Sequence, residues 1–343
     1  MDIVLRKEYL RFINFWLISL LIFIAIIVIV GGLTRLTDSG LSITTWDVVS
    51  GILPPLNNNE WEKAFNLYKE IPQFYLLNQS MTMTEFKVIY YWEYIHRVLG
   101  RILGLLFLIP FIFIYFNKIL NNKYTWNFFV LFLLILLQGT VGWYMVKSGL
   151  VDNTTVSHYR LAIHLNLALI LFSAIFWYFL NIKNKENKIF FDFKNKFILP
   201  KIFIFLIFLQ ITFGAFTSGL DAGKIYQTWP LMNNYFFPDD LSIKDIIFPQ
   251  IFNEPSFVQF LHRKLAYIIF FYVLLISFLT FYKKDKDMYN SIYFLLTMIF
   301  IQIILGIFTL LSGAHILIAS LHQISTILLL ISSIYFYYKS LKT

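Results

Sequence analysis

The histidines have the widest chemical range of the residues in this sequence, because the chain contains no cysteine. Without thiols there is no disulfide and no thiolate-bound metal, so a tightly held metal would need imidazole or oxygen ligands. Four of the six histidines fall into two related pairs, His96 with His164 and His262 with His322. This arrangement favours two separate sites, each with two imidazoles.

One carboxylate distinguishes the first pair from the second. Glu93 precedes His96 by about one helical turn, so the two side chains would share a helix face, and Gln259 holds the equivalent position before His262. A carboxylate partly buried at such a site could accept or deliver a proton. The alternative is a carboxylate at a helix end, paired with Arg97. We expect proton-coupled chemistry in the first half only, with Glu93 as the candidate catalytic residue.

Membrane-spanning helices must position these residues. The chain of 343 residues is 59% hydrophobic and 14% charged, which lies outside the composition of soluble proteins and excludes a soluble enzyme. Eight apolar segments are long enough to cross about 30 Å of hydrocarbon. They are Phe12–Gly32, Trp92–Phe116, Trp126–Val146, Leu161–Leu180, Ile202–Leu220, Phe257–Tyr282, Ile292–Leu311 and Ile316–Tyr338. The first is too long for a signal-peptide core, so we expect it to be retained.

Basic residues predict how these helices are oriented. Lysine and arginine cluster at the N-terminus and in alternate connections, and such clusters lie on the cytoplasmic side. The clusters fall at 6–11, 118–123, 183–201, 283–286 and 339–342. Both termini are therefore predicted to be cytoplasmic, and the outer side carries two long loops, 33–90 and 221–256. The net charge of +9 reports this topology, and nucleic acid is not an expected partner.

An internal repeat relates the two halves of the chain. At one constant spacing, Gly31, Thr34, Asp38, Gly40, Thr45 and Trp46 recur as Gly214, Thr217, Asp221, Gly223, Thr228 and Trp229. Further along, Gln138, Gly142, Ser148 and Gly149 recur as Gln302, Gly306, Ser312 and Gly313. Four helices per half is an even number, so both copies insert the same way round. We expect an all-α polytopic membrane protein whose eight transmembrane helices form two parallel-repeat four-helix bundles, 1–182 and 183–343.

Paired imidazoles on facing helices of a bundle suit axial ligation of heme iron. A copper or zinc site would ordinarily need a third or fourth protein ligand, and neither half offers one beyond Glu93. Arg97 and Arg263, which directly follow two of the histidines, could bind heme propionates as bidentate donors. The alternatives are histidines that only bridge helices by hydrogen bonds and arginines that anchor helix ends at the membrane interface.

Two further features are interpreted as structural. The segments 34–46 and 217–229 are predicted to fold back over the helix ends as lids, with their glycines and aspartates in turns. His158 and His315 stand at outer helix ends, and we interpret both as polar residues at the level of the lipid headgroups. The alternative is that they serve as ligands in place of the neighbouring histidines.

Together these motifs resemble the heme A synthase family. The resemblance rests on Glu93-Tyr-Ile-His96-Arg97 at the start of the second span, on a histidine at the start of each later even-numbered span, and on the GGLTRLTDSG segment from Gly31. That segment is similar to the mitochondrial and alphaproteobacterial branch, and the resemblance covers nearly the whole chain. Some bacterial members have a cysteine pair in the first outer loop. Its absence here excludes electron entry through thiols.

The resemblance implies a reaction and an assignment of the sites. Heme A synthases oxidise the C8 methyl group of heme O to a formyl group, through a hydroxymethyl intermediate, for cytochrome oxidase. His96 and His164 would hold the substrate heme O, with Glu93 as the essential carboxylate. His262 and His322 would hold a resident heme b. Implied partners are an unidentified electron donor, with heme O synthase, assembly factors and a second copy of the chain as further candidates, in a bacterial inner membrane.

Two other classes of protein fit part of the pattern. A membrane electron carrier with two b-type hemes would use the same paired histidines, but it would make no altered heme. A transporter would explain a parallel repeat, but transporters typically have interrupted helices near the membrane midplane rather than ligand pairs at one end. Chromatography of hemes extracted from cells with and without the gene separates these classes.

Overall fold

The computed structural model describes residues 3–46, 50–151, 154–190 and 198–341. Within them, eight helices are long and apolar enough to cross a membrane. They are α1 (Leu10–Leu36), α4 (Met83–Phe116), α5 (Asn122–Gly149), α6 (His158–Asn184), α7 (Ile198–Gly219), α8 (Pro255–Tyr282), α9 (Tyr289–Leu311) and α10 (Ile316–Ser340). The all-α fold with eight membrane-spanning helices is confirmed. Parts of the basic clusters at 183–201 and 339–342, and residues 47–49 of the first loop, lie outside the described residues.

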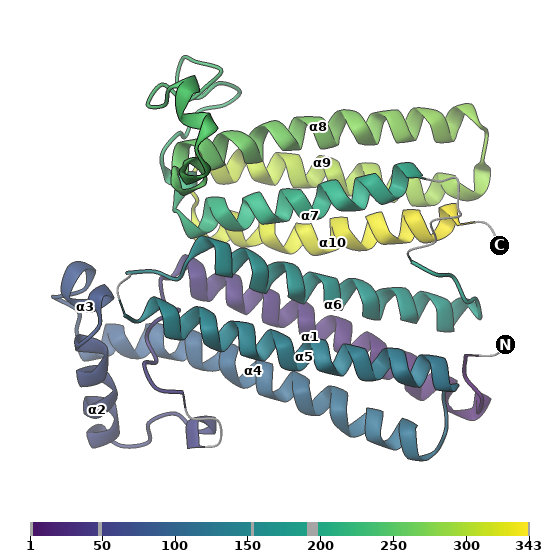
Figure 1. Cartoon of the computed structure of the whole chain (residues 1–343), viewed down its shortest axis with the longest axis horizontal. Helices are drawn as coiled ribbons and strands as arrows, with labels where there is room; N and C mark the ends of the chain where they lie inside the picture. Colours follow the sequence, from purple (N-terminus) through teal and green to yellow (C-terminus); the bar gives the residue numbers. More distant parts are fainter. Residues whose placement is uncertain (1–2, 47–49, 152–153, 191–197, 342–343) are drawn as a thin grey trace.

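The long helices lie side by side in two groups of four (Figure 1). In one group α1 packs on α4 and α6, and α5 packs on α6; in the other, α7 packs on α8, and α9 packs on α10. The groups meet where α6 contacts α7 and where α1 contacts α10. Helices suit this setting because each one satisfies its own backbone hydrogen bonds without water.

Large apolar side chains also cover the outward faces of the helices. Phe15, Phe205 and Phe271 are 72%, 65% and 66% exposed, and many leucines and isoleucines on the same faces are exposed as well. Exposed apolar surface on this scale is unfavourable in water and favourable in lipid. The outer surface of the helices therefore fits a hydrocarbon environment.

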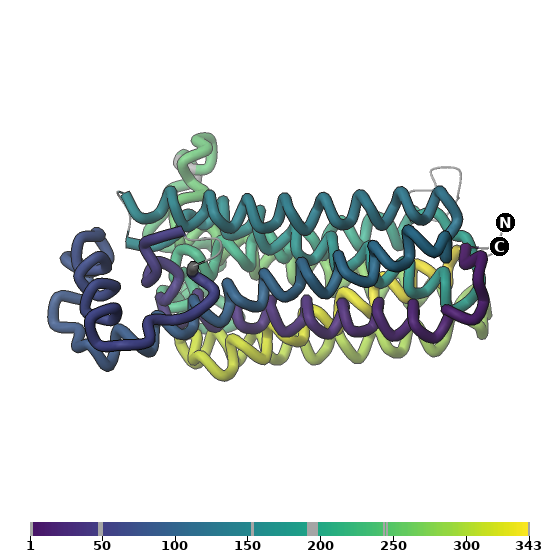
Figure 2. The backbone as a smooth tube through the Cα atoms, turned by 90° about the horizontal axis from the view of Figure 1, so that it is seen from below, coloured from purple at the N-terminus to yellow at the C-terminus, as the bar shows by residue number. Residues whose placement is uncertain are grey.

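Both predicted outer loops lie at the end of the molecule opposite the two termini (Figures 1 and 2). The first contains two helices that the apolar pattern did not predict, α2 (Asn58–Lys69) and α3 (Pro72–Leu77), and α4 begins at Met83 rather than at Trp92. The Asn57 side chain accepts a hydrogen bond from the Glu60 N–H, and this cap begins α2. Thr82 and Glu85 form a capping box at the start of α4.

Candidate heme sites

The structure brings the four predicted histidines together as two pairs near the end of the molecule that carries α2 and α3. The ring centroids are 6.4 Å apart for His96 and His164, and 6.5 Å apart for His262 and His322. Each ring has a buried Nδ1 that makes no well-formed hydrogen bond among the described residues, although backbone groups of Ile27, Gln210 and Gln302 lie near the rings of His96, His262 and His322. Buried nitrogens without partners are rare and call for a ligand or a function.

The spacing of the rings fits a shared iron atom. Two metal–imidazole bonds of about 2.0–2.1 Å on opposite sides of one metal place the ring centroids roughly 6.3 Å apart. The ring planes are turned by 71° in the first pair and 83° in the second, which axial ligation permits because each plane needs only to contain its own metal–nitrogen bond. The described residues form no group of three or more His, Asp or Glu side chains that could hold a bare metal ion.

Each histidine faces a glycine on a neighbouring helix, which lets the helix backbone approach the ring. An added Cβ would lie 2.8 Å from His96 at Gly31, 2.9 Å from His164 at Gly142, 3.2 Å from His262 at Gly214 and 3.0 Å from His322 at Gly306. All four glycines belong to the internal repeat. The repeat therefore preserves the space around the rings as well as the rings themselves.

Glutamines hold the backbone of three of these histidines. Gln138 donates to the His164 carbonyl at 2.9 Å and Gln210 to the His262 carbonyl at 3.0 Å. Gln302 donates to the corresponding carbonyl in the second half, that of His322, at 3.2 Å. These contacts fix the helix segments that carry the rings.

Glu93 is buried, with 3% of its surface exposed. Its carboxylate accepts hydrogen bonds from the Ser42 hydroxyl and the Ile43 N–H, both at 2.8 Å, and forms an ion pair with Arg97 at 2.6 Å. The pairing with Arg97 that the sequence left as an alternative is thus present. A role for Glu93 in catalysis stays a prediction.

Gln259, the counterpart of Glu93, makes the opposite kind of contact. Its amide donates to the carbonyls of Ala222 and Tyr226, at 2.8 and 3.1 Å. Both positions therefore hold the chain segment that follows the first helix of their half. Only the first half does so with an ionisable group.

The two arginines hold the predicted lids. Arg97 donates to the carbonyls of Ile43 and Thr45, and its guanidinium carbon lies 4.7 Å from the centre of the Trp46 ring. Arg263 donates to the carbonyls of Thr228, Pro230 and Leu231. These bonds confirm that both segments fold back over the helix ends. Propionate binding by the arginines stays a prediction.

His158 is buried in the protein rather than open to the headgroups, and its level in the membrane stays a prediction. His158 is 8% exposed and packs against Phe216 and Gly219 of α7, where the two helix groups meet. Its position at a helix end suggested exposure, but the end of α7 covers it. His315 is exposed and caps α10, and its placement among headgroups stays a prediction.

The sequence interpretation assigned no role to Arg35, which the structure shows linking the two helix groups. It is 9% exposed and pairs with Asp38 at 2.7 Å and, across the groups, with Asp221 at 3.1 Å. It also donates to the Ser218 carbonyl at 2.7 Å. The sequence contained one signal for this role: Arg35 is charged, whereas the equivalent position in the second half of the repeat holds Ser218.

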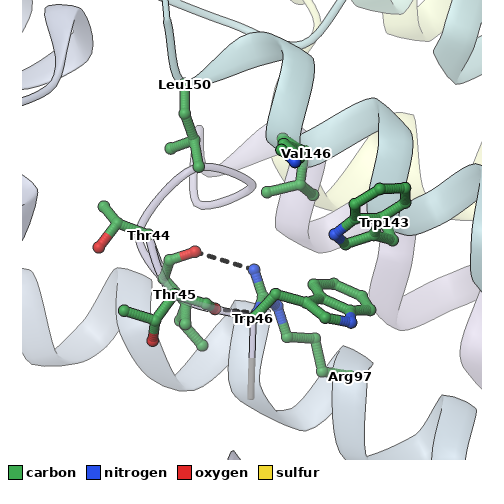
Figure 3. A pocket seen from close by; sticks show the side chains of 9 residues that line it. Thr44, Thr45, Trp46, Arg97, Trp143, Val146 and Leu150 are labelled. Atoms are coloured by element: carbon green, nitrogen blue, oxygen red, sulfur yellow. Dashed lines mark hydrogen bonds between the residues drawn. The ribbon is translucent and has the colours of Figure 1, made fainter. Parts of the chain in front are cut away.

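A cavity of about 210 Å³ lies between the first lid segment, α4 and the end of α5. Its walls are the lid segment, Arg97 of α4 and one face of α5: Ile43, Thr44, Thr45, Trp46, Arg97, Trp143, Val146, Lys147 and Leu150. Figure 3 shows Arg97 bonded to the lid backbone, with Trp143 on the α5 wall. Sequence reasoning had not picked out the α5 residues.

Comparison with known proteins shows which family the chain belongs to. Residues 14–334 match the COX15-CtaA family model, which is described as a cytochrome oxidase assembly protein. The chain belongs to this family. Curated relatives named heme A synthase include one from Pelagibacter ubique, 50% identical over 340 residues, 97% of this chain and 98% of the relative. Another, from Rickettsia africae, is 40% identical over 329 residues, 94% of this chain and 96% of the relative.

Membership confirms the predicted family and its alphaproteobacterial branch. The prediction of an oxidoreductase of the heme A synthase kind is likewise confirmed, as is that of a multi-pass membrane protein. The membrane orientation, the site residues and the division of the chain at 182 stay predictions.

Proposed function

We propose that this protein oxidises the C8 methyl group of heme O to a formyl group, through a hydroxymethyl intermediate, and so makes heme A for cytochrome oxidase. The observation that carries the proposal is the contrast between the two histidine pairs: their ring spacings are nearly equal, but among the described residues only the first pair has a buried carboxylate in the helical turn before it. The names of the relatives support the same reaction.

In this proposal His96 and His164 hold the substrate, and His262 and His322 hold a resident heme b. Heme b, when bound, supplies one-electron redox chemistry. The paired imidazoles would hold the iron of the substrate and so limit the movement of its reacting edge, which favours reaction at the periphery. Each oxidation step removes two electrons from the methyl carbon and passes them to an external electron acceptor, and we assign to Glu93 the transfer of a proton that accompanies this chemistry.

Orientation in the membrane follows from the same proposal. The termini lie together at one end of the helices (Figure 1), and the basic clusters support a cytoplasmic location for that end. The histidine pairs, the lids, α2 and α3 then face the outer side of a bacterial inner membrane.

The decisive experiment is Glu93→Gln. Glutamine retains an oxygen that can accept from Ser42 and Ile43, so the fold and the heme content should be preserved. Loss of a positioned proton acceptor should lower formyl heme production by about 100-fold or more. Hemes extracted from cells that express each variant are separated by chromatography. Normal formyl heme in the variant would remove Glu93 from the mechanism.

Removing one resident ligand tests the assignment of the second pair. In His262→Ala, heme b retained by the purified protein should fall by about half or more if other hemes stay bound, because a single imidazole holds heme weakly. The reduced-minus-oxidised absorbance of b-type heme measures this. His315→Ala is the matched control and should keep its pigment. Equal pigment in both variants would contradict the assignment.

A carrier with two b-type hemes is the second candidate function. The close agreement of the two ring spacings, 6.4 and 6.5 Å, favours it. It predicts no formyl heme in a host that gains this gene together with a source of heme O, whereas the synthase predicts a new formyl heme.

A further inference from the structure

The cavity between the first lid segment and the end of α5 is lined by residues that directly follow those that carry or face both imidazoles, although neither histidine lines it. Arg97 directly follows His96 in α4. On α5, Trp143 directly follows Gly142, the glycine that faces the ring of His164. The other lining residues of α5 lie further toward the end of that helix that is remote from the chain termini. The cavity therefore lies toward the outer ends of the helices that carry His96 and face His164.

Among the described residues, the walls of this cavity carry two cations and no carboxylate. Arg97 and Lys147 both line it. Glu93 neutralises Arg97 in the ion pair at 2.6 Å but is not part of the wall. The Lys147 Nζ lies 5.0 Å from the centre of the Trp143 ring, and no described acidic residue pairs with it. Within the described part of the chain, the charge of Lys147 therefore has no carboxylate partner, and it favours an anionic ligand.

The second half of the repeat lacks this charge. At the repeat spacing of this helix, Lys147 corresponds to Leu311. Trp143 corresponds to Ile307, whereas Arg97 has its equivalent in Arg263. The arginines bind lid carbonyls in both halves, so they do not distinguish the two sites. The difference lies on the α5 wall, beside the same histidine pair that has Glu93.

We propose that this cavity is a carboxylate site for the porphyrin substrate and that Lys147 binds a propionate there. The inference rests on the proposed function, because it takes His96 and His164 as the substrate pair. An exposed lysine has a flexible stem and a compact charge that can follow a carboxylate. Trp143 offers the stem and the porphyrin edge an apolar surface. Lys147 is then a specificity-determining residue that the second site does not have.

Binding of two porphyrins that differ only in their carboxylates tests the proposal. The full-length protein in detergent is titrated with heme b and with heme b dimethyl ester, and Soret absorbance reports binding. The binding phase of the titration that disappears in the His96→Ala variant belongs to the first histidine pair. In that phase, heme b should bind about ten-fold more tightly than its ester, as expected for one charge-assisted contact.

Lys147→Gln should reduce this preference to about two-fold or less, since its amide carries no charge. Lys147→Arg should keep most of the preference for heme b over its ester. Lys63→Gln removes an exposed lysine of α2 and should leave it unchanged. The phase that belongs to His262 and His322 should respond to none of these changes and serves as an internal control.

Three results would overturn the proposal. The first is a preference unchanged in Lys147→Gln. The second is an equal weakening of heme b and its ester, which would assign Lys147 to an anion other than the porphyrin carboxylate, such as a lipid phosphate. The third is the same loss in Lys63→Gln, which would show a general effect of surface charge.

Chromatography of hemes from the same preparations separates this inference from the proposed function. Formyl heme together with a preference that does not depend on Lys147 would refute the carboxylate site alone. A preference that depends on Lys147 without any formyl heme would refute the reaction alone.

Discussion

At the scale of single residues, glycines decide whether the histidine rings fit. Gly31 and Gly142 each leave room for an imidazole that a methyl group would crowd, with added Cβ contacts of 2.8 and 2.9 Å. Contacts under 3.0 Å force a neighbour to move. The helix backbone that carries these glycines therefore sets the position of the rings.

We expect Gly31→Ala to impair heme binding by the first pair, because the new methyl group would push His96 out of line with His164. The Soret phase of that pair should lose at least about half of its amplitude, or its affinity should fall several-fold. Gly139→Ala on α5, where nothing lies within 4 Å, is the control and should bind heme normally. Equal binding by both variants would show that the ring tolerates the methyl group.

The sequence predicted the residues of the pairs but not all of their contacts. Histidine identity, helix position and the repeat were enough to predict that His96 would face His164. The burial of His158 depends on packing of α6 against α7, which local spacing does not encode. The role proposed for Lys147 could be inferred only by comparing the two halves of the repeat around the cavity.

At the scale of elements, the segments after α1 and α7 are linked by charge. Arg35, near the end of α1, pairs with Asp221 just beyond the end of α7. Burial raises the pKa of the Asp221 carboxyl, but Arg35 and Lys224 outweigh burial and hold the pKa below its ordinary value of 3.8. A carboxyl with a lowered pKa stabilises the folded state above that value and loses this contribution as the pH falls.

Asp221→Asn should therefore destabilise the protein at pH 7, and the difference from the native chain should shrink as the pH falls below about 4. Partial exposure of Asp221 keeps the effect modest, about 1 kcal/mol. Thermal unfolding midpoints in detergent across this pH range measure it. A difference that stays constant down to pH 3 would mean that the ion pair does not stabilise the fold.

Apolar length predicted all eight membrane helices, because hydrocarbon thickness sets a minimum span that few other sequences meet. It did not predict α2 or α3, which have too few consecutive apolar residues. Their signals were local: Asn57 before Glu60, and Pro72 at the first turn of a helix. Such caps are short patterns that occur in many loops, so they gain meaning only with the fold.

At the scale of the whole molecule, the two helix groups touch close to both histidine pairs. Gln323, next to His322 in α10, donates to the Val28 carbonyl of α1 at 2.7 Å. An added Cβ at Gly32 would overlap the Gln323 side chain, at 1.7 Å from its Oε1. Gly31 faces His96 one residue earlier. This stretch of α1 therefore lies between the two proposed heme sites.

Gly32→Ala should consequently lower heme retention by the second pair, although the change lies in the first half, because it displaces the neighbour of His322. The double variant Gly32→Ala with Gln323→Ala removes the overlap and should recover most of the pigment. Absorbance of b-type heme in the purified variants measures both. A loss of pigment that Gln323→Ala does not relieve would place the damage elsewhere in α1.

Both histidine pairs lie near the same end of the helices, far from the chain termini. An electron delivered at the end that carries the chain termini must travel along most of the helix bundle. Moving one charge across a membrane changes the free energy by about 2.3 kcal/mol per 100 mV. Turnover driven from that side would depend on the membrane voltage. If the reductant instead arrives at the end of the helices that the lid segments cover, the rate of turnover should not depend on the membrane voltage.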